Sequence, residues 1–292
     1  MLVVGAGTMG AQIALQAALH GVAVSLVDVS EAQLRRAMAG NRQRLERRVE
    51  RGKLEPEQAE AALERVTASS DLTAAAADAA WAIEAVVEDV DVKVEVFAAL
   101  DRALPADAGI ATNSSNIVVS RLAGATTRPE LCCNMHFFHP VLVMDMCEVG
   151  RGPQTSDDTV MRALGWARRM GRTAIVVERE IDGLIVNRIL GAASREAFTL
   201  LADAVATAED IDTAVRTGLN WPMGPFELAD FSGLDTVLGV RRDRMTRERE
   251  PGDEATVAVL ERLVAAGRLG RKSGRGFYDY ATDPPTPLAL PG

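Results

Sequence analysis

Short apolar runs alternate with helix-like stretches along the first part of the chain. The run Leu2 to Val4 meets a glycine-rich turn, a compact helix follows as far as His20 and Gly21, and Val22 to Val27 alternates as a strand does. The same succession continues to residue 177, with further strands predicted at residues 81–87, 109–112, 132–137, 145–149 and 173–177. It predicts an α/β fold, a Rossmann-like doubly wound parallel sheet with helices on both faces.

Two predicted helices interrupt this alternation early. Ser30 and Gln33 have the spacing of a capping box, and the helix that they begin runs to Arg51. Pro56 then opens a second helix that ends at Arg65. The pair is longer than a crossover between strands needs, so we interpret it as a helical-hairpin insertion.

The alternation of strands and helices stops after Glu178. Residues 183–204 have the pattern of one long, largely apolar helix, and shorter helical patterns follow up to residue 267. We therefore predict an α/β domain over residues 1–180 and an all-α domain over residues 181–281. Residues 282–292 contain four prolines and are predicted to be disordered.

The composition is that of a soluble globular protein. Apolar residues make up 48% of the 292 residues, too many for a disordered chain. No apolar run reaches the roughly 18 residues of a membrane span, and we expect no signal peptide. A net charge of −9 argues against nucleic acid as a partner. The odd set Cys132, Cys133 and Cys147 fits buried thiols in a reduced, cytoplasmic protein.

Lysine is scarce among the basic residues. Only Lys53, Lys93 and Lys272 are lysines among 32 basic residues, a bias that suggests a GC-rich, bacterial genome. Where arginine is the default base, a retained lysine suggests a specific role.

Gly5, Gly7 and Gly10 form the pattern G-x-G-x-x-G, which follows a predicted strand and opens a helix. Asp28 follows 23 residues after Gly5, at the end of the second strand, and this context makes the motif specific for a dinucleotide. The glycines let the backbone approach a pyrophosphate at a helix N-terminus. Asp28 can accept hydrogen bonds from a ribose diol and would repel a 2′-phosphate, so NAD is predicted in preference to NADP.

Polar residues at four places are candidates for chemistry. His136 and His139 lie three residues apart and Glu148 follows in the next strand, which fits a metal site, a satisfied core histidine, or a proton-transfer pair oriented by the carboxylate. Residues 112–116 form a polar turn or a ligand loop after a strand. Asn187 lies among apolar residues of a helix, so we expect its amide to have a structural partner or a ligand.

These motifs resemble those of the 3-hydroxyacyl-CoA dehydrogenases, including the short bacterial 3-hydroxybutyryl-CoA enzymes. The resemblance covers nearly the whole chain. The matching segments are Gly5 to Gly10 (GAGxMG), Asn113 to Ser115 (NTSS), His136 to Pro140 (HFFNP), Val186 to Arg188 (IVNR), Pro222 to Glu227 (PMGPFEL) and Gly270 to Tyr278 (GKKTGEGFY). Several such motifs in the same order are highly specific.

The resemblance implies an enzyme of fatty acid metabolism that oxidises a 3-hydroxyacyl thioester with NAD. His136 would be the general base, Glu148 would hold it, and Ser115 and Asn187 would bind the reacting oxygen and the thioester region. The helical domain would form a homodimer. The positions that the glycine motif and the resemblance place near NAD are Gly5, Gly7, Thr8, Met9, Gly10, Asp28, Glu88, Lys93, Ser115, His139 and Lys272.

Some positions depart from the family pattern. His139 replaces an asparagine, Asn116 a serine, Asp145 a lysine and Asp182 a proline. The four catalytic positions are intact, so we expect catalysis and leave the substrate open. The alternatives are an acyl group on a carrier protein, a non-thioester hydroxy acid, and an NAD(H)-binding protein without turnover, which the intact positions disfavour.

The helix predicted over residues 31–51 has a basic side. Arg44, Arg48 and Arg51 fall together beside its apolar stripe. They form either a solvated face or a docking site for a polyanion. In the resembling family this helical excursion contacts CoA, so CoA is the first candidate, and an acidic carrier protein would use the same patch.

Overall fold

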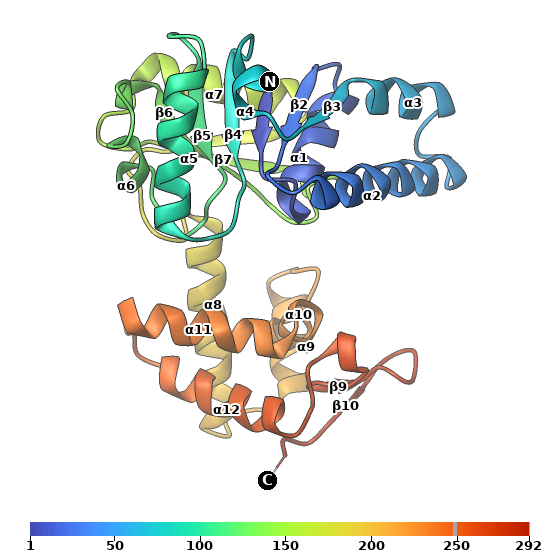
Figure 1. Cartoon of the computed structure of the whole chain (residues 1–292). Helices are drawn as coiled ribbons and strands as arrows, with labels where there is room; N and C mark the ends of the chain where they lie inside the picture. Colours follow the sequence, from blue (N-terminus) through green and yellow to red (C-terminus); the bar gives the residue numbers. More distant parts are fainter. Residues whose placement is uncertain (248–249, 292) are drawn as a thin grey trace. The chain divides into compact units, whose positions relative to one another are not determined.

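A computed structural model of the chain describes residues 1–247 and 250–291. The chain divides into two compact units, Met1–Ile185 and Val186–Gly292 (Figure 1). The first unit has the predicted doubly wound α/β fold and the second is mostly helical. No helix in the described ranges is both long and apolar enough to cross a membrane.

The first unit is an eight-stranded sheet covered by helices. Its strands are β1 (Leu2–Val4), β2 (Val24–Val27), β3 (Val66–Ser69), β4 (Trp81–Glu84), β5 (Gly109–Thr112), β6 (Cys132–Phe137), β7 (Met146–Gly150) and β8 (Thr173–Val177). Its helices are α1 (Thr8–Leu19), α2 (Glu31–Glu50), α3 (Pro56–Glu64), α4 (Leu72–Ala76), α5 (Val90–Ala103), α6 (Ser120–Ala123) and α7 (Asp157–Arg169), with a 3-10 turn at Pro129–Leu131. The strand order is β3-β2-β1-β4-β5-β6-β7-β8, and Figure 1 shows α2 and α3 extending from the sheet as a hairpin.

One strand pair departs from the predicted parallel arrangement. β6 and β7 are antiparallel, whereas the other neighbouring strands of this sheet are parallel. Only residues 138–145 join the two strands, which is too short for a parallel crossover of about a dozen residues. The pairing places His136 directly opposite Glu148.

The strand β3 and the short helix α4 are not predicted by the sequence pattern. β3 is the edge strand of the sheet next to β2, and of its residues only Val66 is buried. Thr67 and Ala68 are exposed, so the segment lacks the apolar pattern of a strand. The predicted long helix over residues 183–204 is also shorter, because Gly183 and Leu184 have φ angles of +81° and +46°, which are not helical.

The second unit packs helices around an aromatic core. It contains α8 (Val186–Ala202), α9 (Ala208–Gly218), α10 (Pro225–Ser232), α11 (Leu234–Arg247), α12 (Asp253–Ala265), a 3-10 turn at Arg271–Ser273, and the strands β9 (Tyr278–Asp279) and β10 (Thr286–Pro287). The rings of Phe198, Phe226 and Phe277 lie 4.6 to 5.7 Å apart between centroids. The described tail differs from the predicted disorder. Its strand β10 pairs with β9, and Arg268 donates a hydrogen bond to the Ala289 carbonyl (2.7 Å).

Two buried carboxylates organise this unit. Asp212 accepts hydrogen bonds from the N–H groups of Phe226 (2.8 Å) and Glu227 (3.0 Å) at the start of α10, and from the hydroxyl of Tyr278 (2.7 Å). Burial raises the pKa of Asp212 to about 6, although these hydrogen bonds oppose the shift. The PMGPFEL segment therefore has a structural role, as the helix start that Asp212 caps.

The closing glycine motif has a similar structural reason. Asp230 accepts the N–H groups of Phe277 and Tyr278, each at 3.0 Å. A Cβ on Gly276 would lie 1.8 Å from a carboxylate oxygen of Asp230, so only glycine allows this approach.

Candidate active site

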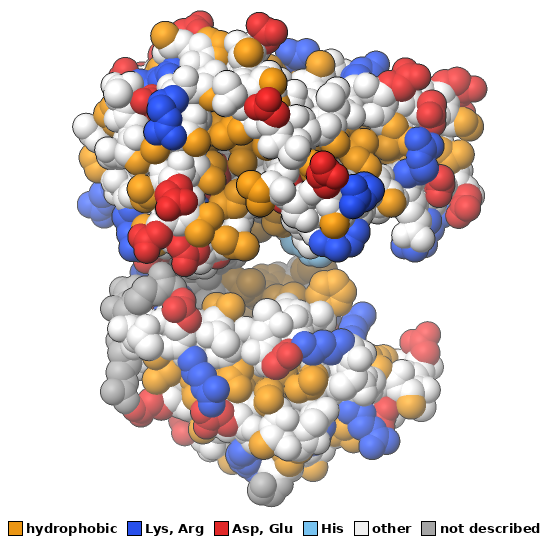
Figure 2. Space-filling view, viewed as in Figure 1, with side chains coloured by type: hydrophobic (Ala, Val, Ile, Leu, Met, Phe, Trp, Pro, Cys, Tyr) orange, Lys and Arg blue, Asp and Glu red, His pale blue; other side chains and the backbone are white. Residues whose placement is uncertain are grey.

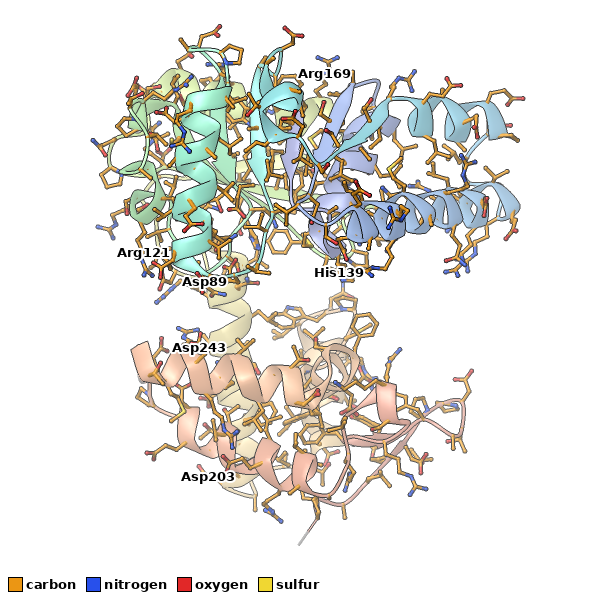
Figure 3. The ribbon with its side chains drawn as sticks, viewed as in Figure 1. Asp89, Arg121, His139, Arg169, Asp203 and Asp243 are labelled. Carbon is orange, nitrogen blue, oxygen red and sulfur yellow. The ribbon has the colours of Figure 1, made fainter. Side chains whose placement is uncertain are left out.

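Several of the selected segments meet at one edge of the first unit. The strands β1, β2, β4, β5 and β6 are parallel and end at the same edge. The strand order reverses between β1 and β4, where open α/β sheets form a binding crevice. Figure 3 shows Asp89, after β4, and His139, after β6, at this edge, and Arg169, at the end of α7, at the opposite edge.

The glycine loop between β1 and α1 lies at this reversal. Gly5 has a φ of +100°, and a Cβ on it would lie 2.5 Å from the Ala85 carbonyl oxygen. A Cβ on Gly10 would lie 1.8 Å from the Gly5 carbonyl oxygen, so both glycines serve close backbone packing. Within the described part of the chain, a Cβ on Gly7 would meet no atom within 4 Å, and no side chain caps α1. The helix N-terminus is therefore left open to an anion such as a pyrophosphate.

Asp28 joins this loop to the end of β2. Its Oδ2 accepts the N–H of Ala6 (2.8 Å), and its Oδ1 accepts the N–H of Ser30 (2.9 Å). Each oxygen keeps a second lone pair for a ribose hydroxyl. Only half of the predicted capping box forms, because the amide of Gln33 donates instead to the Ala6 carbonyl (2.8 Å) and so supports the glycine loop.

The loop after β5 carries Ser115, which is half-buried. Asn113 accepts the N–H of Phe137 (2.9 Å) through its side-chain oxygen. The amide of Asn134 donates to the carbonyls of Thr112 (2.9 Å) and Ser114 (2.8 Å). These bonds hold the backbone before Ser115, whose hydroxyl makes no hydrogen bond within the described residues. Asn134 is not among the predicted site residues, although a polar residue in an apolar strand is a usable signal.

His136 and Glu148 form a buried pair. Nδ1 of His136 lies 2.8 Å from Oε2 of Glu148, and the two residues are 6% and 0% exposed. The ring of Phe138 packs against the imidazole, with centroids 4.5 Å apart. Because the carboxylate occupies Nδ1, Nε2 is the ring nitrogen that remains for proton exchange.

The connector that leads to the second unit touches this pair. The N–H of Ile185 donates to the second carboxylate oxygen of Glu148 (3.0 Å). The N–H of Gly183 donates to the carbonyl of Ser115 (2.7 Å). The non-helical turn at residues 183–184 thus places backbone donors on two of the selected residues.

The remaining first-unit positions near the glycine loop differ in exposure. Thr8 is exposed and Met9 is half-buried, at the start of α1. His139 is exposed, which leaves its ring accessible at the edge described above.

Lys93 joins a buried acid, Glu84, to an exposed one, Glu88. Lys93 is 1% exposed, and its ammonium lies 2.6 Å from Glu84 and 3.3 Å from Glu88. Glu84, which the sequence analysis did not select, ends β4 with 0% exposure. An acid within an apolar strand was again the available signal.

Two selected residues belong to the second unit. Asn187, in the first turn of α8, is half-buried, and its expected structural partner or ligand stays a prediction. Its neighbour Ile189 on the same helix is 59% exposed. Lys272 donates to Asp235 (2.6 Å) at the closing turn of the same unit.

The basic side of α2 is a surface separate from the His136–Glu148 pair. Figure 2 shows Lys and Arg side chains over α2, with Asp and Glu side chains among them and over α3. Arg44 and Arg48 are half-buried and Arg51 is exposed. Burial lowers the pKa of Arg172, and the positive charge of Arg48 lowers it further, whereas Asp145, 3.5 Å away, raises it.

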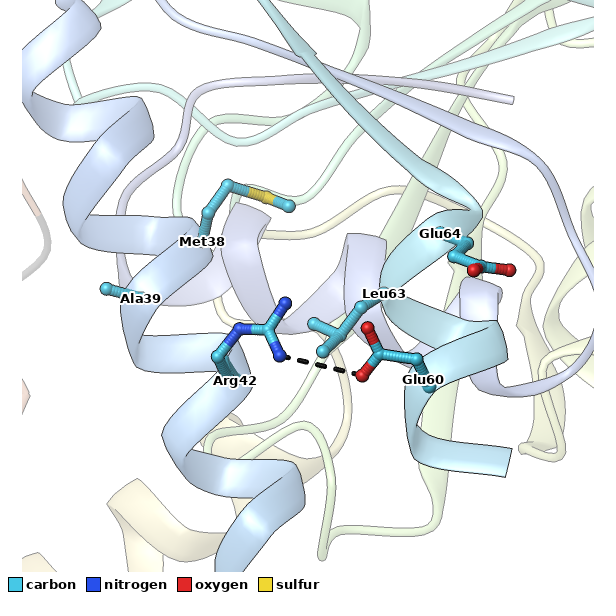
Figure 4. A pocket seen from close by; sticks show the side chains of 6 residues that line it. All are labelled: Met38, Ala39, Arg42, Glu60, Leu63 and Glu64. Atoms are coloured by element: carbon cyan, nitrogen blue, oxygen red, sulfur yellow. Dashed lines mark ion pairs between the residues drawn. The ribbon is translucent and has the colours of Figure 1, made fainter. Parts of the chain in front are cut away.

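A separate pocket of about 370 Å³ opens between α2 and α3. Met38 and Leu63 line it, and an ion pair between Arg42 and Glu60 (3.5 Å) crosses it (Figure 4). The pocket belongs to the hairpin, and none of the basic residues selected on α2 lines it.

The three cysteines behave as small buried hydrophobes. Cys132, Cys133 and Cys147 are free and buried, as predicted. Burial raises the pKa of Cys132 to about 11 and the pKa of Cys147 further, so the thiols stay protonated. No group of three or more His, Cys, Asp or Glu side chains suited to a metal occurs among residues 1–247 and 250–291.

Comparisons with known proteins agree along the whole chain. A family model for the NAD binding domain of 3-hydroxyacyl-CoA dehydrogenase matches residues 1–181, and a model for the C-terminal domain of the same family matches residues 183–280. A 3-hydroxybutyryl-CoA dehydrogenase of Bradyrhizobium diazoefficiens is 39% identical over 98% of this chain and 96% of that protein. The crystal structure of FadB2 from M. tuberculosis superposes with a TM-score of 0.87 at 38% identity, over 96% of this chain and 98% of that one.

A third relative is named for a different substrate class. The structure of a diketoreductase, whose title describes dual catalysis of dicarbonyl compounds, has a TM-score of 0.87 at 32% identity. It covers 96% of this chain and 98% of that one.

Proposed function

The chain belongs to the 3-hydroxyacyl-CoA dehydrogenase family and is an NAD-dependent oxidoreductase, and we propose that it interconverts a 3-hydroxyacyl-CoA thioester and its 3-ketoacyl form. The observation that carries the proposal is the buried His136–Glu148 pair, at the same sheet edge as an open glycine loop. A base held by a carboxylate suits removal of a hydroxyl proton.

The proposed roles are cofactor binding, proton transfer and substrate binding. The glycine loop and Asp28 hold the dinucleotide, which supplies a hydride acceptor at its nicotinamide when bound. Nε2 of His136 takes the proton of the 3-hydroxyl, and Glu148 orients the ring through Nδ1 and stabilises the charge that forms on it. Ser115 offers a free hydroxyl to the reacting oxygen, and the family resemblance gives Asn187 a role in binding the thioester region.

The basic side of α2 bears on the carrier of the acyl group. Arg44, Arg48 and Arg51 present cationic groups that suit the phosphates of CoA. An acidic carrier protein would meet the same groups, so it is the rival carrier.

A second candidate substrate is a hydroxy compound without a thioester. The diketoreductase supports it, because that relative acts on dicarbonyl compounds and shares the fold at 32% identity. Such a substrate would need His136 and Glu148 and would be indifferent to the arginines of α2.

Apolar side chains of the second unit support a homodimer through that unit. Ile189, Phe231 and Val240 are 53 to 59% exposed, and a partner copy would cover such side chains. Sedimentation of the full chain tests this, with a dimer expected and a concentration-independent monomer contradicting it.

The activity test is NADH oxidation with a panel of 3-ketoacyl substrates on CoA, on pantetheine and on a carrier protein, together with a simple diketone. We expect the CoA thioester to have the highest kcat/KM. His136→Ala should lower kcat by about 10²–10⁴ while NADH still binds. Wild-type turnover in this variant would contradict the assignment of the base, and a preference for the diketone would favour the second candidate.

A further inference from the structure

β4 ends on an acid that the protein buries completely. Both carboxylate oxygens of Glu84 accept hydrogen bonds. Oε1 accepts from the N–H of Val86 (2.7 Å) and from the ammonium of Lys93 (2.6 Å), and Oε2 accepts from the hydroxyl of Thr112 (2.7 Å). Buried charges are stable only when they are paired and hydrogen-bonded, so Glu84 and Lys93 act as one unit.

The network continues from Lys93 to the loop that carries Ser115. The ammonium lies 3.3 Å from Glu88, and Glu88 accepts a hydrogen bond from the hydroxyl of Ser114. That hydroxyl accepts the N–H groups of Asn116 (3.3 Å) and Ile117 (2.8 Å). The contacts therefore hold the chain on both sides of Ser115.

A second route joins the same two ends. Thr112, which donates to Glu84, also accepts the N–H of Ser114 (3.1 Å) through its hydroxyl. Both routes start at the buried ion pair and end at Ser114, next to the residue whose hydroxyl is free for the substrate. The pair is thus linked to the candidate site without reaching it.

We propose that Glu84 and Lys93 are positioning residues, a buried ion pair that holds the loop of residues 112–117 so that the hydroxyl of Ser115 points at the substrate oxygen. The proposal rests on the proposed role of Ser115. It also explains a retained lysine in a chain with three lysines among 32 basic residues. A compact ammonium reaches both acids in a site that is 1% exposed, where a planar guanidinium would need more room.

A direct contact between Lys93 and the cofactor is the competing explanation. It predicts that loss of the ammonium weakens NADH binding. Positioning predicts instead that the loss lowers kcat through Ser115, because a small misplacement of a reacting group can cost as much as about a hundredfold in rate. The two explanations therefore differ in which constant changes.

The test is a double-mutant cycle between Lys93 and Ser115, which the two routes described above link through Ser114. Lys93→Met, Ser115→Ala and the double variant are compared for kcat, KM of the 3-ketoacyl thioester and the NADH dissociation constant. Arg102→Met is the matched control, an exposed cation on the same helix α5. We expect Lys93→Met to lower kcat about tenfold or more, with less than about a threefold change in the NADH dissociation constant.

In the Ser115→Ala background the same lysine change should lower kcat less than about twofold, because no hydroxyl remains to be positioned. If the double variant loses kcat by the product of the two single-variant factors, the proposal is overturned. A rise in the NADH dissociation constant that matches the loss of kcat would also overturn it. If Ser115→Ala alone leaves kcat unchanged, the proposed role of Ser115 fails, and the positioning role fails with it.

Folding is controlled by a second variant. Lys93→Met leaves two acids without their cation, so its melting temperature is measured first. Glu84→Gln combined with Lys93→Met removes both buried charges and keeps the shape, which is tolerated better than half of a broken pair. If the single variant is unfolded, the cycle with Ser115→Ala is run in this neutral background, with the same expected and overturning outcomes.

Discussion

The middle glycine of the loop allows a sharp test of cofactor binding, because its space is empty in the protein itself. Gly7 has φ −68° and ψ −170°, a conformation that alanine adopts, and an added Cβ would meet no atom of residues 1–247 or 250–291 within 4 Å. Gly7→Ala should therefore keep the free energy of unfolding within about 1 kcal/mol of the wild type, with a small gain from the less flexible unfolded chain. The same methyl group would stand where the pyrophosphate approaches α1.

We expect Gly7→Ala to raise the NADH dissociation constant at least tenfold, about 1.4 kcal/mol. Titration of the NADH fluorescence measures the affinity, and thermal melting without cofactor measures stability. Gly10→Ala is the contrasting variant, because its Cβ would lie 1.8 Å from the Gly5 carbonyl oxygen. It should lose about 1–3 kcal/mol of stability as α1 is displaced. Wild-type NADH affinity in Gly7→Ala, or wild-type melting in Gly10→Ala, would refute this interpretation of the loop.

Three further predictions follow from single features. Because Asp28 would repel a 2′-phosphate, kcat/KM should favour NAD over NADP at least tenfold, about 1.4 kcal/mol, and equal values would contradict this role. Burial raises the pKa of Asp212 to about 6. The protonated carboxyl therefore adds up to about 3 kcal/mol to the free energy of unfolding below about pH 4, and this contribution is lost as the pH rises through about 6. The melting temperature of the wild type minus that of Asp212→Asn should therefore fall between pH 4 and 7, and a constant difference would contradict the shift. Changing Arg44, Arg48 and Arg51 together to Glu should raise the KM of the CoA thioester, less so at high salt, without changing the KM of NAD. Equal effects on a pantetheine thioester, or no effect on either, would show that the patch is not a carrier site.

Local patterns were sufficient to predict most of the fold from the sequence. The run Leu2 to Val4, the helix from Thr8 and the strand that ends before Asp28 lie where their periodicity and end signals placed them. Such signals act over a few residues, so they survive without knowledge of the partner. The edge strand β3 was missed because a strand with one buried residue has no such periodicity. The buried His136 and Glu148 were selected from their residue types, and the family resemblance supplied their roles.

What only the tertiary structure decided is which distant residues share a contact. In the sequence, Glu84 is a single acid in an apolar strand. The fold makes it the partner of Lys93 and of Thr112, which lies 28 residues further along the chain. No sequence signal indicates a role for Asp212. The fold places it at the start of α10 and beside Tyr278, which is 66 residues further along the chain. The physical reason is that periodicity and capping are local properties of the chain, whereas the free energy of a buried charge depends on the groups that the fold places around it.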